Sequence, residues 1–363
     1  MGDPRVIVLG QDIYALGYIS KIIKVKEFKT FRKDKLIQNS YSMKVKNFDN
    51  FFSVDNTHSL LNGQEWQFSP VQIYDGDNEL IWDGIIEDVI RDHKRKTATI
   101  ITQNSMVKFM RTKIEYESGD WETPAEASRN ILDAYGFTNY NSASFTGSDN
   151  KLIDEGCYIK CHFEKGDDIT LQSAIEKLGE YGCADVYSHL GEIFFDVYRE
   201  FTGGVKTSIG LDEADAPVVK GLLRDIINEY RIRYTDDAGT PATDANSNNI
   251  GARSRAKFGV RSLPEMGGTS EDQIEIKDKT SATYIGECYI NQSHANLSTG
   301  NVRALWQIDF TLPLTHRGWI DLNTFFRFTL PDEEWNEKLF EIYTFDKDYD
   351  RQQMKITAIE RIE

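Results

Sequence analysis

Two segments near opposite ends of the chain share one strand–turn–strand pattern, one in residues 81–102 and one in residues 340–359. In each, an apolar run is followed by a charged turn and by a second apolar run. The turns lie at Asp92–Lys96 and Asp346–Arg351, and each has an Asp three residues before an Arg. Both segments are typical of β-hairpins, and their likeness predicts two copies of one small β-domain. The alternative is that any two antiparallel hairpins look this similar.

Composition favours a folded, strand-rich protein of several domains. The chain has 363 residues, which at roughly 150 residues per domain predicts two to four domains. Aromatic residues make up 12% of it and only 8 residues are Pro, which suits β-structure. No apolar run approaches the ~18 residues of a membrane span, and the N-terminal apolar stretch is too short for a signal peptide.

The charge balance argues against nucleic-acid recognition. There are 42 Lys and Arg against 58 Asp and Glu, a net charge of −16, and such an excess of carboxylates repels phosphates. One segment, 21–49, is basic, and we interpret it as a solvated or partner-facing side of early strands. The four Cys are too few for a disulfide framework and favour free thiols in a reducing compartment.

The first 110 residues read as strands almost throughout, with a turn at Asp75–Asn78, and predict a small antiparallel barrel or sandwich. The next stretch predicts α+β structure. Thr123, Pro124 and Glu126 are typical of a helix start, and the helix is expected to end at Gly136. A second helix is expected with Asp168 as its cap, followed by a tight hairpin over 184–198.

The following segments predict an interruption and then a return to strands. Residues 222–235 end in an alternating strand, whereas 236–254 has almost no large apolar side chain and is expected to be a loop. A third helix is expected over 281–294. From Arg303 onward the pattern is strand after strand.

Nucleotide and metal sites find little support. The segment Gly10–Gly17 lacks the spacing of a pyrophosphate cradle and is followed by a strand-like run. Cys157, Cys161 and His162 could suggest metal ligation, but no second Cys/His pair stands at zinc-site spacing, so we interpret these cysteines as structural. No catalytic, cofactor-binding or metal-binding residue is therefore assigned, and no cofactor is expected.

Acidic clusters and tryptophans remain as weaker candidates. The acids 332–334 and 212–213 could form a hydrolase pair, but solvated loops explain them more simply. Six scattered tryptophans could bind glycans, although core packing is the simpler explanation. They are Trp66, Trp82, Trp121, Trp306, Trp319 and Trp335. The chain is accordingly expected not to be an enzyme.

The order of these local patterns resembles the tail-hub proteins of bacteriophage baseplates and of related contractile injection machines. The resemblance covers nearly the whole chain, while each motif alone is loose. The segments that carry it are VQIYDGDNELIWDGIIEDVIRDHKRKTATIITQNS, LQSAIEKLGEYGCADVYSHLGEIFFDVYR, RDIINEYRIRYTDD, SRAKFGVRSL and EIYTFDKDYDRQQMKITAIERI.

The resemblance implies a mainly β fold with two similar tube-like antiparallel β-barrels and a middle α+β domain. The expected parts are a first barrel over 1–110, the middle domain over 111–217, a second barrel interrupted in sequence, and an insertion over 237–299 with a flexible loop and one helix. The second barrel would combine residues 218–236 and 300–363.

The implied function is structural. Three copies would form a pseudo-sixfold ring that joins a hexameric tail tube to a trimeric central spike and leaves a channel for DNA. Expected partners are further copies of the chain, the tail tube protein, the central spike protein, and also the tape measure protein and baseplate wedge or distal tail proteins. No sequence-specific nucleic acid and no membrane segment are expected, and the protein would reside in the virion.

Two alternatives remain at this point: another virion tail component of hexameric symmetry, such as a distal tail or wedge protein, and a glycan-binding β-protein. One departure from the family is Leu322–Thr324, where members often have a Gly-Asp pair. The resemblance further implies that the spike and any cell-wall hydrolase are separate chains.

Overall fold

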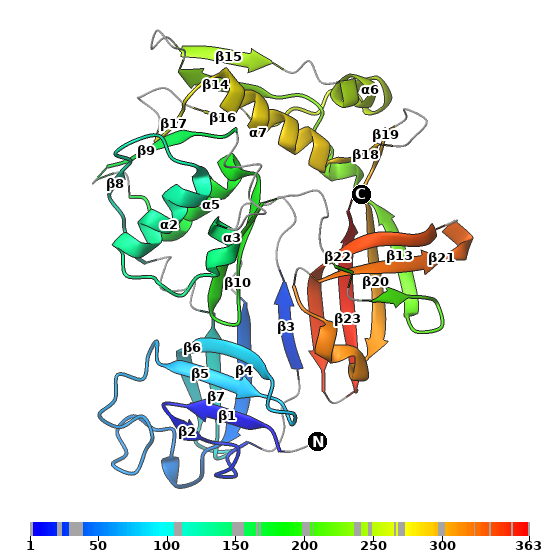
Figure 1. The fold of residues 1–363 in the computed structure, drawn as a ribbon. Helices are drawn as coiled ribbons and strands as arrows, with labels where there is room; N and C mark the ends of the chain where they lie inside the picture. Colours follow the sequence, from blue (N-terminus) through cyan, green and yellow to red (C-terminus); the bar gives the residue numbers. More distant parts are fainter. Residues whose placement is uncertain are drawn as a thin grey trace.

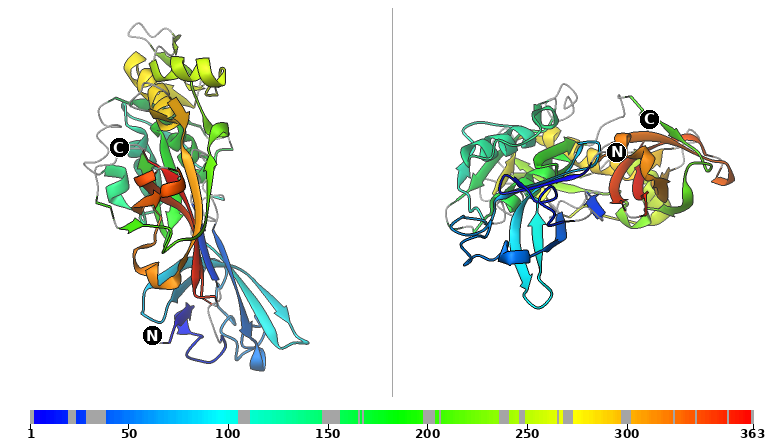
Figure 2. Two further views of the ribbon diagram at one scale, coloured as in Figure 1. Left: turned by 90° about the vertical axis from the view of Figure 1, so that its right-hand side faces the viewer. Right: turned by 90° about the horizontal axis from the view of Figure 1, so that it is seen from below.

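The computed structural model shows a mainly β protein with two large sheets and a part that contains the α-helices (Figure 1). In Figure 1 the opening sheet lies at the bottom, the closing sheet at the right, and the helices lie above them. The two sheets belong to opposite ends of the sequence, and seen from below they lie side by side (Figure 2). The structure describes residues 3–19, 24–28, 39–104, 111–146, 156–164, 166, 168–197, 204–205, 207–235, 241–245, 249–264, 266–267, 273–296, 302–322, 324–333, 335–349 and 351–361.

The opening sheet has the strand order β2-β1-β5-β6-β7-β4. Alternation of polar and apolar residues makes one of its faces the core: in β4, Tyr41, Met43 and Val45 are buried while the residues between them are exposed. Its strands are β1 (Arg5–Val8), β2 (Gln11–Asp12), β4 (Ser40–Lys46), β5 (Pro70–Tyr74), β6 (Leu80–Asp92) and β7 (Thr97–Gln103).

The closing sheet has the order β12-β21-β22-β23-β20-β13, and a further strand, β3 (Lys24–Phe28), pairs with β22. Phe326, Phe328 and Phe340 are fully buried and stack on its core face. The strands are β12 (Ser208–Ile209), β13 (Asp215–Gly221), β20 (Trp306–Pro313), β21 (Phe325–Leu330), β22 (Trp335–Asp348) and β23 (Gln353–Glu360). Short 3-10 turns η4 (Leu314–Trp319) and η5 (Pro331–Glu333) connect them.

Four consecutive strands of each sheet are arranged in the same way. In the opening sheet the order is β5-β6-β7-β4, so β4, the first of these strands in the sequence, lies beside β7, the last. In the closing sheet the order β21-β22-β23-β20 places β20 beside β23 in the same way. All three pairings are antiparallel in both sheets. Two sheets from opposite ends of one chain therefore share a four-stranded topology.

The central hairpins of the two sheets also share their register. Every paired residue of β6–β7 corresponds to the residue 256 positions later in β22–β23, as Asp92↔Thr97 corresponds to Asp348↔Gln353. Each hairpin has a bulge at the same place, where Glu87 and Tyr343 are the extra residues. A shared bulge position is unusual for unrelated hairpins, which favours the predicted duplication.

The two turns close with the same contact. The Arg95 backbone N–H donates to Asp92 Oδ1 at 3.0 Å, and the Arg351 N–H donates to Asp348 Oδ1 at 3.0 Å. The last turn residue, Lys96 or Gln352, has a positive φ of 55° or 54°. The Asp–Arg spacing noticed in the sequence is thus the spacing of one turn type.

Between the two sheets in the sequence lies an α+β part built around one helix pair. The predicted capping box is confirmed at α2, where Thr123 and Glu126 satisfy each other's backbone groups. The expected cap at Asp168 is wrong: Thr170 caps α5, and Asp168 instead contacts Lys113 at 2.5 Å. The elements are β8 (Tyr116–Glu117), α2 (Pro124–Ala134), α3 (Ser142–Thr146), β9 (Ile159–Phe163), α5 (Leu171–Gly182), β10 (Ala184–His189) and β11 (Glu192–Val197).

The segment that separates β13 from β20 contains more regular structure than expected. Its elements are η3 (Leu223–Asp225), β14 (Arg231–Thr235), β15 (Pro241–Ala245), α6 (Asn249–Phe258), β16 (Met266–Gly267), β17 (Ile274–Ile276), α7 (Lys279–Gln292), β18 (His294–Asn296) and β19 (Val302–Ala304). The helix predicted over 281–294 is confirmed as α7. The prediction of a loop over 236–254 is wrong for the described residues 241–245 and 249–254. Strand β15 pairs there with β14, and α6 begins at Asn249. Backbone pairing and helix contacts there compensate for the lack of large apolar side chains.

The same segment packs against the middle of the chain. Within the described strands, β13 pairs with the closing sheet, whereas β14 pairs with β15 and β16. The assignment of 218–236 to a second barrel stays a prediction. Strand β17 pairs with β9, and Ile285 of α7 shares one hydrophobic core with Leu178 of α5. The middle part and the interrupting segment therefore form one packed unit.

We predict that the matched turn contacts contribute similarly to stability. Replacing Asp92 or Asp348 with Ala removes the acceptor for the backbone N–H, and each change should lower the free energy of unfolding by about 1 kcal/mol. Asp→Asn at either position retains an acceptor oxygen and should cost less. Urea denaturation measures both; a large effect in one turn and none in the other would contradict the structural equivalence.

Candidate functional site

The contact between the two ends of the chain is made by β3. This strand belongs to the first 50 residues but pairs antiparallel with the second half of β22, from Thr344↔Phe28 to Asp348↔Lys24. Strand β21 pairs with the first half of β22, so β3 continues the same edge where β21 ends. The backbone of the opening part thereby extends the closing sheet (Figure 1). Part of the basic segment predicted to face a partner, residues 21–23 and 29–38, lies outside the described residues.

A buried polar network connects the closing sheet to the middle part. Arg361 pairs with Glu341 of β22, and both side chains are almost completely buried. Arg361 also donates to the Tyr343 hydroxyl at 3.0 Å, which donates in turn to Asp185 of β10 at 2.8 Å. Burial raises the pKa of Tyr343 well above its ordinary value, so the hydroxyl remains a donor. The network holds β10 against β22.

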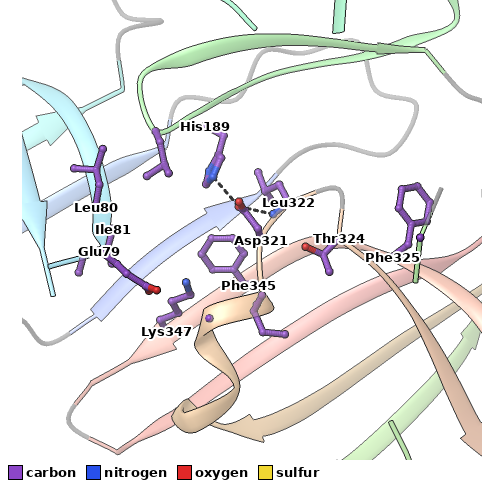
Figure 3. A pocket seen from close by; sticks show the side chains of 14 residues that line it. Glu79, Leu80, Ile81, His189, Asp321, Leu322, Thr324, Phe325, Phe345 and Lys347 are labelled. Carbon is purple, nitrogen blue, oxygen red and sulfur yellow. Dashed lines mark hydrogen bonds and ion pairs between the residues drawn. The ribbon is translucent and has the colours of Figure 1, made fainter. Parts of the chain in front are cut away.

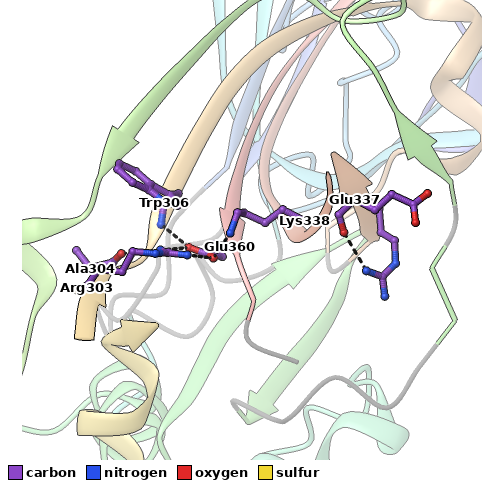
Figure 4. A network of polar contacts seen from close by, with 7 residues as sticks. Arg303, Ala304, Trp306, Glu337, Lys338 and Glu360 are labelled. Atoms are coloured by element: carbon purple, nitrogen blue, oxygen red, sulfur yellow. Dashed lines mark hydrogen bonds and ion pairs between the residues drawn. The ribbon is translucent and has the colours of Figure 1, made fainter. Parts of the chain in front are cut away.

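A second network lies at the end of the closing sheet near the start of β20 (Figure 4). Arg303 contacts Glu360 through both terminal nitrogens, one of them at 2.6 Å, and Lys338 donates to the same carboxylate at 3.1 Å. The Trp306 backbone N–H completes the set at 3.0 Å. With all these donors directed to one carboxylate, the cluster is a structural ion network rather than a reactive group.

A cavity of about 660 Å³ lies where the opening sheet, the β10–β11 hairpin and the closing sheet meet (Figure 3). His189 Nε2 at the hairpin tip lies 2.6 Å from a carboxylate oxygen of Asp321, and Leu80, Phe345 and Lys347 lie around them. A His–Asp pair can orient a general base, but the lining residues that the structure describes include no Ser or Cys beside it. The cavity is a joint between three parts of the chain.

The cysteines considered as metal ligands are core residues. Cys161 lies on β9 and Cys157 just before it, and both are buried. Burial raises the pKa of Cys161 to about 12 and that of Cys157 further, so both thiols are protonated at neutral pH. His162 faces the other way, with Nε2 3.6 Å from Glu275. In the described part of the chain, no group of three His, Cys, Asp or Glu side chains is placed to hold a metal ion.

A contact between Ser254 and His294 is the arrangement nearest to a nucleophile and its base. The Ser254 hydroxyl lies 2.5 Å from His294 Nε2, while Nδ1 contacts the Ile290 carbonyl at 2.9 Å. Both side chains are fully buried, and Asn228 also contacts Ser254. A substrate has no path to this hydroxyl, so the contact fixes α6 to the end of α7.

The other candidates from the sequence are dispersed. Asp332 and Glu333 are exposed in η5, and Asp212 and Glu213 are exposed in a turn before β13, as predicted for solvated loops. Residues 10–17 form β2 and turns rather than a strand-to-helix cradle. Trp82 and Trp335 are buried, Trp66, Trp121 and Trp306 are half-buried, and the Trp319 side chain lies outside the described part. No helix among the described residues is long and apolar enough to cross a membrane.

We predict that the Arg361–Glu341 contact is important for stability. Arg361→Ala leaves the buried Glu341 carboxylate without its guanidinium and should lower the free energy of unfolding by about 3–5 kcal/mol. The matched control is Arg351→Ala, which breaks an exposed pair with Asp348 and should cost at most about 1 kcal/mol. Equal effects of the two changes in chemical denaturation would contradict this role.

The cysteine environments predict selective alkylation. At pH 8 the native protein should react with iodoacetamide first at the half-buried Cys288, because Cys157 and Cys161 are inaccessible and carry raised pKa values. Peptide mass spectrometry locates the label. Labelling of Cys161 as fast as Cys288 in the native protein would show that β9 is not in the core.

Comparison with known proteins identifies the fold. No protein-family model matches the chain, and no curated protein matches its sequence. The 43 kDa tail protein of prophage MuSo2 from Shewanella oneidensis superposes with a TM-score of 0.58 over 99% of this chain and 98% of that chain, at 12% identity. A tail protein from Neisseria meningitidis MC58 superposes with a TM-score of 0.60 over 99% and 97%, at 7% identity. The chain has the fold of phage tail proteins, which confirms the resemblance inferred from sequence.

Proposed function

We propose that this chain is a non-enzymatic hub protein of a phage tail or baseplate, whose three copies form a ring. The observation that carries the proposal is the repeated four-stranded topology, with one register and one bulge position in both central hairpins. The fold of phage tail proteins supports the setting in a virion. The described candidates for catalysis are buried, exposed singly or already satisfied by structural contacts, which agrees with a role in assembly.

The repeat has a use in a ring. Three chains with two similar sheets each present six similar sheets, so one side of the ring can match a sixfold tube while the assembly keeps threefold symmetry for a spike. Such an adaptor needs two equivalent sheets at similar positions in each chain. Strand β3 supports this by making the closing sheet continuous with a strand from the opening part of the same chain.

The four-part domain division stays a prediction, with one change. We propose that the two sheets are the ring-forming parts and that residues 111–205 and 222–300 together form the outer part. The shared core of α5 and α7 and the β9–β17 pairing support this grouping. The partners of the ring would be the tail tube protein on one side and the central spike protein on the other, with tape measure, wedge or distal tail proteins as further contacts.

A channel through the ring would have to let DNA pass. The net charge of −16 can supply a repulsive wall, because carboxylates within about 10 Å of the duplex repel its phosphates. The faces of the sheets away from the core carry acids such as Asp88 in β6, whereas Asp309 in β20 pairs with Lys220. These faces are our candidates for the channel wall.

The assembly state tests the proposal. Light scattering of the purified chain should give three times the 41.6 kDa mass of one chain, and negative-stain images should show a central hole. A sixfold mass would favour a distal tail or wedge component instead. A monomer at all accessible concentrations, in the presence of spike protein as well, would contradict the ring.

A further inference from the structure

The second half of β22 and the second half of β6 are equivalent strand edges, but a further strand pairs with only one of them. In the closing sheet, β3 pairs with the edge of Thr344–Asp348. The constant offset between the hairpins makes Asp88–Asp92 of β6 the corresponding edge in the opening sheet. Strand β5 pairs with β6 only up to Ile85. The second half of β6 pairs with β7 through one edge, and no described strand pairs with its opposite edge.

The strand that corresponds to β3 is β13. Each follows a strand that pairs with the outer strand of the four on the side away from β4 or β20: β1 pairs with β5, and β12 pairs with β21. The position of these two strands is the same, while the first pairing is antiparallel and the second parallel. Each also comes before the strand at the outer end of the four, β4 or β20. Within its own chain, β13 pairs with β20 through one edge, and no described strand pairs with its other edge.

The two open edges each carry a large apolar side chain that faces solvent. Ile90 of β6 is 55% exposed and Val218 of β13 is 50% exposed. Their neighbours Val89 and Val219 face the other way, toward the cores of their sheets. Ile90 and Val218 therefore lie on the faces that point away from the cores, as two residues must if they are to become neighbours in one continuous sheet.

We propose that β13 of one copy pairs antiparallel with the open edge of β6 in a second copy, as β3 pairs with β22 within one chain. The inference rests on the proposed ring and names its contact. The antiparallel direction follows from the correspondence, because β13 takes the place of β3 and β6 takes the place of β22, and β3 runs antiparallel to β22. The partner strand comes from a second copy of this chain, because each copy has both open edges and the β3–β22 contact shows how the equivalent edges pair.

One register suits the residue types at both edges. If Val218 stands opposite Ile90, then Lys220, which pairs with Asp309 of β20 within its own chain, stands opposite Asp88. An apolar pair then lies beside a lysine that two carboxylates flank on one face. Each added strand would also satisfy a row of backbone groups that an open edge presents to water. Around a ring, sheets would then be joined alternately by β3 within a chain and by β13 between chains.

Disulfide trapping tests the contact and its register. Directly opposite residues have Cβ atoms roughly 4.5–5.5 Å apart, close enough for a disulfide after small adjustment. A chain with both Ile90→Cys and Val218→Cys, oxidised mildly, should give cross-linked species up to three chains on non-reducing gels. A mixture of the two single variants, co-assembled, should give two-chain species and nothing larger. The matched control combines Ile90→Cys with Val260→Cys, because Val260 is 64% exposed outside both edges, and should give no cross-link.

The outcomes separate this contact from the ring. A threefold mass without cross-links, or with equal cross-linking in the Val260 control, would overturn the β13–β6 pairing and leave the ring intact. A monomer without cross-links would overturn both. Charge substitution provides a second measurement: Ile90→Glu should abolish the threefold species, while Val260→Glu should leave it unchanged. A ring that persists in Ile90→Glu would count against the pairing.

Discussion

The pairing of β3 with β22 is the contact on which the arrangement of this molecule depends. It places backbone from the first 50 residues on a sheet whose four central strands lie within residues 306–360, and it covers an edge that would otherwise expose unpaired N–H and C=O groups. The Arg361–Glu341 and Tyr343–Asp185 contacts connect β22 itself to the middle part. Both ends of the chain are thereby held around β22.

The repeated topology gives this arrangement a physical meaning. An open strand edge has unpaired backbone N–H and C=O groups, and two sheets of one topology have equivalent edges. The chain completes one of them with its own β3. If a strand of a neighbouring copy pairs with the other edge, the same kind of contact joins sheets within a chain and between chains. Whether three copies then close into a ring depends on the angle between the two sheets of each chain.

Local patterns made much of this fold predictable. Alternation in β4, the capping box at Thr123 and the Asp–Arg spacing in both turns depend on residues close in sequence, and each predicted its element correctly. The cap at Asp168 was misplaced because Thr170, two residues later, offers a hydroxyl with Ser173 as its reciprocal partner. Strand β15 was missed because its small polar residues form a strand only through pairing with β14.

Long-range pairings were beyond the reach of local patterns. The β3–β22 contact joins residues more than 300 positions apart, and only the alternation of Lys24 and Lys26 opposite Asp348 and Asp346 hints at it in the sequence. For the same reason, the sequence could not reveal that α7 shares a core with α5, or that the His189–Asp321 pair bridges two parts of the chain.

A cryo-electron microscopy reconstruction of the assembled protein, computed without imposed symmetry, would show whether the two sheets of each chain build one ring. We expect three chains around a channel, with six four-stranded sheets of one topology at near-60° intervals. A closed particle in which the opening and closing sheets occupy unrelated radii or orientations would contradict it.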